Sequence, residues 1–243
     1  MPTGIIVNAL SIAVGGVLGA LAGNRVSDDF KAKIQMIFGV CSMAMGISSI
    51  VLMKNMPAVV FAVIIGTALG LAIHLEDKIN RGGAAMQRVI SKVIGTGGAK
   101  ENQEEFMETL ITVIVLFCAS GTGIYGSIVS GMSGDHSIMI AKSILDLFTA
   151  MIFACSLEMV VAVIAVPQFF IFLLLFLCAG LIFPLTTPEM IDDFKACGGI
   201  LMLATGFRMI KVKMFPTADM ILGMVIVMPV SYFWSAFILP MVS

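Results

Sequence analysis

Long apolar runs recur along almost the entire chain and constrain its fold more than any other feature. Each run is close to the about 20 residues that an α-helix needs to cross a bilayer. Only 12% of the residues are charged, whereas a soluble domain carries about twice that share. The sequence therefore predicts an all-α, polytopic membrane helix bundle. About eight transmembrane helices are expected, at residues 3–23, 34–53, 57–75, 106–131, 138–166, 168–184, 197–213 and 217–240.

Prolines stand at or near the ends of several of these runs, because proline cannot continue a helical hydrogen-bond ladder. They are Pro57, Pro167, Pro188, Pro216 and Pro240. The fifth run is separated from the sixth only at Pro167 and Gln168, and a single kinked helix is the alternative at this boundary.

Lysine and arginine are unevenly distributed between the two sides that eight alternating spans would create. One side receives Arg25, Lys31, Lys33, Lys78, Arg81, Arg88, Lys92, Lys100, Arg208, Lys211 and Lys213, and the other receives Lys54, Lys142 and Lys195. Cytoplasmic loops are enriched in these residues, so the first side is predicted to be cytoplasmic. Both termini then face outward, in a multi-pass protein of a bacterial inner (plasma) membrane.

We expect residues 1–243 to form a single transmembrane domain. Helices one to three cover 1–75, the central helices four and five cover 106–166, and helices six to eight cover 168–240. In the cytoplasmic connection 76–105, apolar residues recur at helical spacing: Met86, Val89, Ile90, Val93 and Ile94. This predicts an amphipathic helix with a basic face, which either lies on the inner membrane surface in contact with lipid or packs on the bundle.

Glycines recur at four-residue steps on the first and third helices. They are Gly15, Gly19, Gly23, Gly66 and Gly70. Small residues at this spacing let helix backbones approach closely. Packing is the preferred interpretation, and assembly of a homo-oligomer through the same faces is the alternative.

Short sequence similarities suggest internal repeats. The tetrapeptide DDFK occurs at residues 28–31 and again at 192–195, each time followed by an apolar helix with an internal glycine and then by a proline. With eight alternating spans the two copies lie on opposite sides, which predicts an inverted repeat relating helices one to three to helices six to eight. Such repeats are common in transporters, although four matched residues also arise by chance.

Between residues 117 and 146 an apolar helix gives way to glycine and small polar residues, and the next apolar helix contains charges. Lys142 and Asp146 stand four residues apart, on one helix face. A charge inside a membrane span is costly and normally pairs or lines water. The pair is therefore either a self-neutralised ion pair that fixes this helix or the lining of a solute or ion path.

Polar residues of helices one, four and five are expected at one depth, in the outer half of the membrane. They form the candidate substrate site: Asn8, Ser120, Thr122, Tyr125, Ser127, Lys142 and Asp146. Helix four is expected to be interrupted at Gly121, Gly123 and Gly126, which would bare backbone groups. Glu158 is expected deeper, as a buried carboxylate that either carries a proton or hydrogen-bonds a neighbouring helix.

The sequence contains no signature of catalysis or of metal or cofactor binding. The five cysteines form no CxxC pair and are expected to be small apolar packing residues. The segment GTGIYG resembles a glycine-rich phosphate loop, but it lies in a membrane helix with no strand before it. We therefore expect no enzyme, no metal and no cofactor and, without a basic block, no nucleic-acid partner.

Four stretches of the chain carry a family resemblance. They are TGIIVNALSIAVGGVLG near the N-terminus, CASGTGIYGSIVSGMSGD, KSILD, and GGILMLATGFRMIKVK near the C-terminus. Together they resemble the YqgA/YdfK-like family of uncharacterised bacterial integral membrane proteins. The resemblance spans nearly the whole chain and implies an inner-membrane location without an established substrate.

Two functions follow as hypotheses. The first is a small-solute or ion transporter or channel with a polar site in the outer half of helices one, four and five. The alternative is a non-transporting membrane scaffold or sensor that assembles through its glycine-rich helix faces. Hydration of Asp146 distinguishes them, because a path needs water there and a scaffold packs this residue dry.

Overall fold

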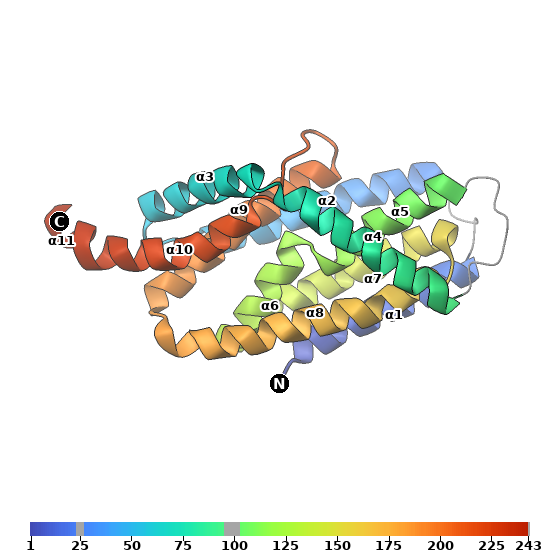
Figure 1. Cartoon of the computed structure of the whole chain (residues 1–243), viewed down its shortest axis with the longest axis horizontal. Helices are drawn as coiled ribbons and strands as arrows, with labels where there is room; N and C mark the ends of the chain where they lie inside the picture. Colours follow the sequence, from blue (N-terminus) through green and yellow to red (C-terminus); the bar gives the residue numbers. More distant parts are fainter. Residues whose placement is uncertain (23–26, 95–102, 243) are drawn as a thin grey trace. The chain divides into compact units, whose positions relative to one another are not determined.

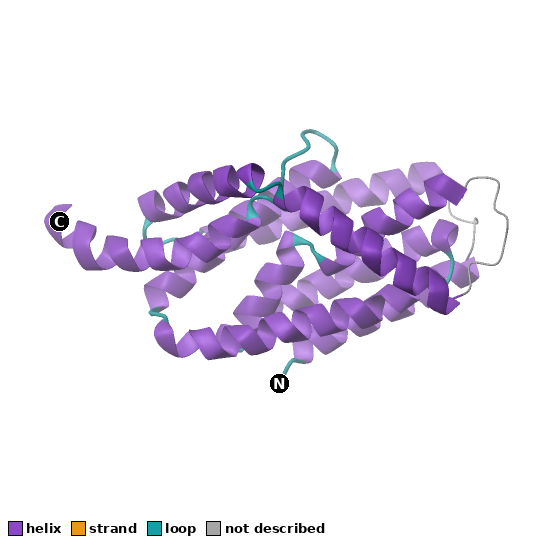
Figure 2. Cartoon of the chain, in the orientation of Figure 1, coloured by secondary structure: helices purple, strands orange, loops and turns teal. Residues whose placement is uncertain are grey.

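The structure, a computed structural model, describes residues 1–22, 27–94 and 103–242. These residues are helical almost throughout, and no strand occurs among them (Figure 2). The chain forms two compact units. Unit 1 comprises Met1–Ile34 and Asp77–Gly180, and unit 2 comprises Gln35–Glu76 and Leu181–Ser243. Each unit therefore joins segments that are far apart in the sequence, as the colours of Figure 1 show.

Helices of both units follow one another in mixed order along the chain. Unit 1 contains α1 (Thr3–Ala22), α5 (Gln103–Cys118), α6 (Gly121–Ser133) and α7 (Ser137–Leu157), with most of α4 (Leu75–Ile94) and α8 (Val160–Ile182). Unit 2 contains most of α2 (Asp28–Ile50), with α3 (Met56–Ala72), α9 (Pro188–Met209), α10 (Ile221–Phe233), a π-helical segment (Trp234–Ile238) and α11 (Leu239–Val242). A 3₁₀ turn at Phe183–Leu185 follows α8.

Six segments are long and apolar enough to cross a membrane, counted over the described residues. They are Thr3–Ala22, Asp29–Ile50, Thr109–Ser133, Ser137–Leu157, Val160–Leu185 and Ile221–Met241. The pair Met56–Ala72 and Leu75–Ile90, bent by 60°, makes a seventh when taken as one span. The helix α9 has a similar length, 22 residues, but carries more charges. The prediction of an all-α membrane bundle with about eight helices is thus confirmed.

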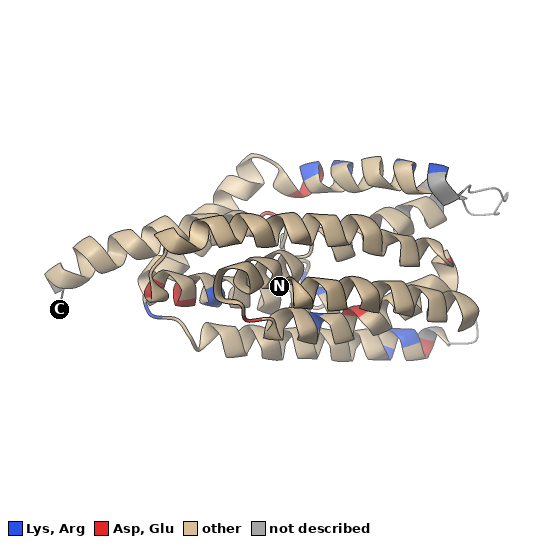
Figure 3. Cartoon of the chain, turned by 90° about the horizontal axis from the view of Figure 1, so that it is seen from below, with Lys and Arg blue, Asp and Glu red and all other residues tan. Residues whose placement is uncertain are grey.

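The outward surface of the helices is largely apolar. Six large hydrophobic side chains from α1, α8 and α10 are each more than half exposed: Leu10, Leu21, Phe170, Leu174, Leu181 and Val225. Charged residues occupy only short stretches of the ribbon (Figure 3). Lipid tails are as apolar as these side chains, so the surface suits a bilayer rather than water.

The fifth predicted helix, 138–166, ends earlier than expected. The helix α7 ends at Leu157, and the chain turns at Glu158, whose φ is 61°. The next helix begins at Val160 and contains Pro167 within it. Proline is tolerated inside a membrane helix because neighbouring groups satisfy the freed backbone, so it did not mark the boundary here.

Glycines set the packing of α1 on α7. A Cβ added at Gly15 would lie 2.2 Å from the carbonyl oxygen of Leu147, and one added at Gly19 would lie 2.1 Å from that of Met151. The two backbones therefore touch directly, which only glycine permits at these positions. Gly23, the third residue of the predicted ladder, lies outside the described residues.

Unit 2 uses glycine in the same way. A Cβ added at Gly66 would lie 2.3 Å from the Cα atom of Gly223 on α10, and Gly70 packs against the backbone just before that helix. On α2, a Cβ added at Gly46 would lie 2.6 Å from the carbonyl oxygen of Gly199 on α9. The spacing of small residues thus marks helix faces that are covered within the chain.

The directions of the packed helices agree with alternating spans. The helices α1 and α7 run parallel, because Gly4 packs against Met139 at the start of α7 and Gly19 packs further along it. The helices α2 and α9 run antiparallel, because Gly39, midway along α2, packs against Gly206, late in α9. Spans one and five point the same way when spans alternate, and spans two and seven point opposite ways.

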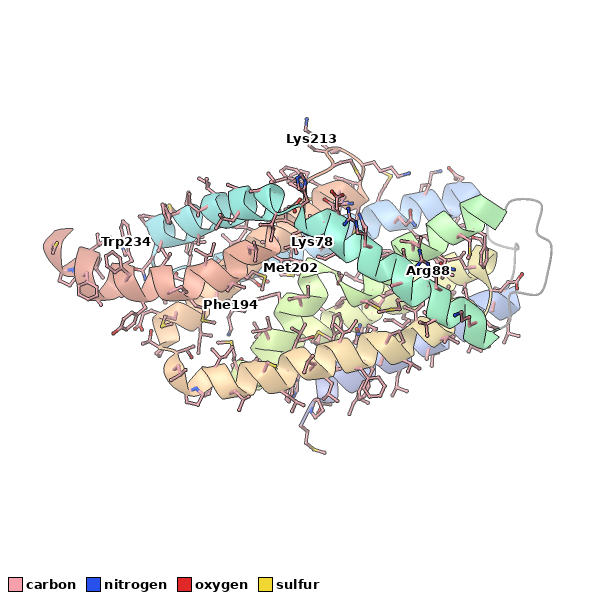
Figure 4. All side chains as sticks on the ribbon, in the orientation of Figure 1. Lys78, Arg88, Phe194, Met202, Lys213 and Trp234 are labelled. Carbon is pink, nitrogen blue, oxygen red and sulfur yellow. The ribbon has the colours of Figure 1, made fainter. Side chains whose placement is uncertain are left out.

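The amphipathic helix α4 packs on α5 within unit 1. A Cβ added at Gly83 would lie 2.7 Å from the side chain of Val115, and Ile90 is buried in the core shared with α5. Lys78 and Arg88, both labelled on α4 in Figure 4, are exposed. Of the two arrangements expected for this segment, the structure has the one in which it packs on the bundle.

Candidate functional site

Four polar side chains from three helices form a continuous hydrogen-bonded network inside unit 1. Lys142 and Asp146 of α7 form an ion pair, and Asn8 of α1 donates from Nδ2 to the same carboxylate oxygen, Oδ2, over 2.8 Å. Gln168 of α8 donates from Nε2 to Oδ1 of Asn8 over 2.7 Å. We call Asn8, Lys142, Asp146 and Gln168 the buried network.

The buried network is almost completely removed from solvent. Asn8 and Gln168 are 0% exposed, Lys142 is 4% exposed and Asp146 is 8% exposed. Desolvating each ion costs several kcal/mol, and replacing a buried ion pair by apolar residues is often neutral or stabilising. Packing alone therefore does not account for a charged pair at this position.

An aromatic ring lies beside the lysine. The Lys142 ammonium is 5.9 Å from the ring centre of Phe172 on α8, within cation–π range. A Cβ added at Gly123 of α6 would lie 2.2 Å from the same ring, and one added at Gly131 would lie 2.3 Å from the carbonyl oxygen of Phe176. The helices α6 and α8 therefore run parallel in close contact next to the network.

A helix break lies near the buried network. The helix α5 ends at Cys118 and α6 begins at Gly121, with Ser120 as its N-cap residue. Cys118 packs in one core with Ile12 of α1 and Ile164 of α8, the helices that carry Asn8 and Gln168. The break places the free backbone groups of two helix ends near the charged pair. It precedes Gly121, whereas the sequence predicted an interruption spread over the glycines that follow.

The structure brings together three of the seven residues that the sequence predicts for the substrate site. Asn8, Lys142 and Asp146 are in direct contact, and they come from helices one and five as expected. The structure thus places these three of the predicted residues side by side.

The other four predicted residues lie on α6 or at its cap. The Ser120 hydroxyl accepts from the backbone N–H of Gly123 over 3.2 Å, and the Ser127 hydroxyl donates to the carbonyl of Gly123 over 2.7 Å. Thr122 and Tyr125 are buried on α6. The hydroxyls of both serines thus stabilise their own helix.

Sequence reasoning missed Gln168. Its position after Pro167 predicts a helix boundary, whereas both residues lie inside α8. The available signal was composition: Gln168 is the one polar side chain in the 23 residues of this helix apart from its cysteine. An isolated amide in an otherwise apolar membrane helix usually hydrogen-bonds across helices.

Glu158 does not occupy the position that the sequence predicts. It lies in the exposed turn between α7 and α8, because the predicted fifth helix continued through a point where the chain reverses. The interpretation of Glu158 as a buried carboxylate is therefore wrong. Its φ of 61° and ψ of −149° fall in a region that strongly favours glycine.

Glu158→Gly is expected to raise the free energy of unfolding by about 1 kcal/mol, because glycine adopts this backbone conformation without strain. Thermal unfolding in detergent measures the change. Glu158→Ala is the matched control, since it removes the same carboxylate but keeps the strain. Equal destabilisation by both variants would show that the carboxylate, and not the backbone, governs this turn.

Unit 2 contains a second buried carboxylate, with a different arrangement. Asp193 of α9 is 0% exposed and accepts from the backbone N–H groups of Lys54 and Asn55 over 2.8 and 2.9 Å. The Asn55 amide and the Ser231 hydroxyl donate to its other oxygen over 2.9 and 2.6 Å. Four donors saturate the carboxylate, so it ties the turn between α2 and α3 to α9 and α10.

No cluster of three or more His, Cys, Asp or Glu side chains that suits a metal ion occurs in the described part of the chain. All five cysteines are free, and Cys118, Cys155 and Cys197 are buried. The buried network itself offers one ammonium, one carboxylate and two amides.

The helical spans, the apolar outward surface and the buried network define a polytopic membrane protein with an internal polar site. The chain belongs to the family described as protein of unknown function DUF554, whose model matches residues 3–232. This family and the relatives below bear out the resemblance seen in the sequence.

Two curated relatives match almost end to end. The chain is 44% identical over 236 residues to the uncharacterized protein YqgA of Escherichia coli (strain K12), which covers 97% of this chain and 99% of the relative. It is 24% identical over 229 residues to the uncharacterized membrane protein YdfK of Bacillus subtilis (strain 168), covering 92% and 93% respectively. No solved structure matches the chain.

Proposed function

We propose that this protein is a small-solute or ion transporter or channel that uses the buried network as its site. The observation that carries the proposal is a charged pair, 4% and 8% exposed, joined to polar side chains from two further helices of a membrane protein. Ionisable residues inside membrane spans are costly and mark solute, ion or proton pathways. The helix break at Ser120 supports the same function, since interrupted helices are typical of transporter sites.

A purely structural role for the Lys142–Asp146 pair accounts for fewer features of the site than a role in transport does. Two opposite charges four residues apart on a helix neutralise each other and require no polar partner from α1 or α8. Asn8 and Gln168 are nevertheless completely buried beside the pair. Each buried amide adds a desolvation cost that a structural pair alone does not call for.

The near-complete burial of Asp146 favours a carrier over an open channel. An open channel would expose the charged pair to water, whereas a carrier passes through closed states as one part of the bundle rocks against another. Asp146, at 8% exposed, fits such a closed state.

The contact between α2 and α9 supports the inverted repeat that many carriers contain. A Cβ added at Gly46 or at Gly199 would lie 2.6 Å from the carbonyl oxygen of the other residue, so the antiparallel contact is reciprocal. A two-fold axis in the membrane plane relates helices in this manner. The two DDFK copies differ in surroundings, since Asp29 is exposed at the start of α2 and Asp193 is buried in α9.

The alternative function, a scaffold that assembles through glycine-rich faces, has less support. Gly15 and Gly19 are covered by α7, and Gly66 is covered by α10, all within the same chain. A homo-oligomer would have to use other helix faces. The scaffold hypothesis therefore loses the surface on which it was based.

Topology follows from the same proposal and is testable. In a cysteine-free background, a cysteine at Ser133 is expected to react with a membrane-impermeant thiol reagent from outside, and one at Ala99 only after the membrane is opened. The physical reason is the excess of Lys and Arg on the side of Ala99. Labelling of Ala99→Cys in intact cells would reverse the orientation proposed here for an inner-membrane protein with both termini outside.

Flux measurements test the function directly. Purified protein in proteoliposomes is expected to pass a solute or ion that the double variant Lys142→Met/Asp146→Leu does not pass, although the variant remains folded. A double variant that is as active as the unmodified protein would exclude the buried network as the path.

A further inference from the structure

The hydrogen-bond directions in the buried network are fixed by its one carboxylate. Asp146 can only accept when ionised, so the Asn8 side chain must present its NH₂ group to it. The Asn8 carbonyl oxygen then faces Gln168, which must donate to it from its own NH₂ group. The orientation of the Gln168 amide follows from chemistry and needs no choice between nearly identical atoms.

These donor and acceptor assignments leave one acceptor of the buried network without a donor. Oε1 of Gln168 is buried and has no hydrogen-bond partner, alone among the buried side-chain nitrogen and oxygen atoms of the described residues. An unpaired buried acceptor costs about 1–3 kcal/mol. Some group that carries an N–H or O–H is therefore needed to complete the site.

The lysine of the network has hydrogen-bond donors that lack an acceptor in the described part of the chain. An ammonium offers three donors, and the recorded polar acceptor of Lys142 among the described residues is Asp146. The remaining donors can serve an acceptor atom on a ligand. The network therefore offers both an unfilled acceptor at Gln168 and unfilled donors at Lys142.

The charge of the network restricts the ligand further. Lys142 and Asp146 already neutralise each other, so a single added ion would bring an uncompensated charge into a site of low dielectric. A cation would also meet the ammonium, and an anion would meet the carboxylate. A solute without net charge avoids both penalties.

We infer that the site takes a small polar solute of zero net charge, which donates an N–H or O–H to Gln168 Oε1 and accepts from Lys142. Uncharged amides and zwitterionic amino acids share this chemistry. The inference rests on the proposed function and narrows it, because it excludes lone inorganic ions as substrates. Asp146 is the most accessible of the four side chains.

The test compares probes that differ in net and formal charge and in their N–H donors. Thermal unfolding of the full chain in detergent is followed with millimolar acetamide, free glycine, betaine or sodium chloride. Acetamide is uncharged and has N–H donors, free glycine is zwitterionic and has them, and betaine is zwitterionic without them. At least one donor-bearing probe is expected to raise the Tm saturably by roughly 2–4 °C, and betaine and sodium chloride are not.

A variant assigns the effect to Gln168. Gln168→Met keeps the size of the side chain and removes its acceptor, so the shift should disappear. Gln87→Met, which replaces another buried glutamine of unit 1, should keep the shift. Should Gln168→Met fail to fold, the comparison of donor-bearing probes with betaine still decides, because it uses the unmodified protein.

Each contrary outcome has a distinct meaning. A shift with betaine equal to that with free glycine overturns the role of Gln168 Oε1, and no shift with either donor-bearing probe overturns the inference, leaving water as the partner of that atom. Flux of a lone inorganic ion that is lost in Lys142→Met/Asp146→Leu would overturn the inference and retain the proposed function. Absence of any flux that depends on this pair would overturn the proposed function itself.

Discussion

Asp146→Asn is expected to lower the free energy of unfolding by about 3–5 kcal/mol, the usual cost of breaking a buried ion pair from one side. Lys142 is 4% exposed, so its ammonium would stay buried without the charge that neutralises it. The reverse change, Lys142→Met, leaves the carboxylate of Asp146 in the same position. Each single variant should therefore unfold well before the unmodified protein.

The double variant Lys142→Met/Asp146→Leu should recover much of this loss, because it removes both charges together. Its free energy of unfolding is expected to remain about 1–3 kcal/mol below that of the unmodified protein, because the NH₂ group of Asn8 loses its acceptor. Thermal unfolding of the unmodified protein, the two single variants and the double variant measures stability. Flux in proteoliposomes measures transport by the same four proteins. Restored stability with lost flux is the result expected of a solute site.

Asp193→Asn is the control for this series. Asp193 is as deeply buried as any member of the network, but its four donors are all neutral. Its substitution should destabilise the protein without changing which solutes bind. Single variants at Lys142 and Asp146 that are as stable as the unmodified protein would show that water screens the pair, which contradicts the burial described here.

Gly19→Leu is expected to be the most damaging substitution on α1. The first added atom would lie 2.1 Å from the carbonyl oxygen of Met151, and a backbone atom cannot move aside as a side chain can. Overpacking typically costs about 1–3 kcal/mol, and a contact this short belongs at the upper end or beyond. Loss of folded protein on size-exclusion chromatography, or a strongly lowered Tm, is the expected measurement.

Gly82→Leu is the matched control for Gly19→Leu. A Cβ added at Gly82 of α4 would meet nothing within 4 Å, and leucine favours helix more than glycine does. The control should be neutral or slightly stabilising. A Gly19→Leu protein that is as stable as Gly82→Leu would show that α1 and α7 are further apart than the structure has them.

The spans could be predicted from sequence because length and hydropathy are local properties. The same locality explains the grouping of Asn8 with Lys142 and Asp146, since position along a span gives depth. What the sequence could not supply is which helix meets which. The glycines of α1 mark a flat face, but nothing in their spacing selects α7 as the partner rather than a second copy of the chain.

The errors have a common physical origin in the treatment of helix ends. Pro167 predicts a helix boundary, although a membrane helix accommodates proline, and this boundary obscures Gln168 as a member of a helix. The true reversal at Glu158 carries neither glycine nor proline, so no local signal marks it. Asp193 was noted only as part of a repeated tetrapeptide, because its four donors come from residues that are distant in sequence.

The helix break before α6 and Gln168 of α8 lie at one level of unit 1. Because α6 and α8 run parallel with Gly123 against Phe172, the break before α6 lies level with Gln168, the residue after Pro167. On the N-terminal side of this level, α8 is held by α1, where a Cβ added at Gly16 would lie 2.5 Å from the nitrogen of Ala162.

On the C-terminal side, Phe172 of α8 packs in one core with Ile5 of α1 and Met139 of α7, and a Cβ added at Gly131 of α6 would lie 2.3 Å from the carbonyl oxygen of Phe176. The helix α8 is therefore fixed on both sides of Gln168. The Gln168 amide is thereby held in place beside Asn8, so its free acceptor is preorganised and does not have to be ordered when a donor binds.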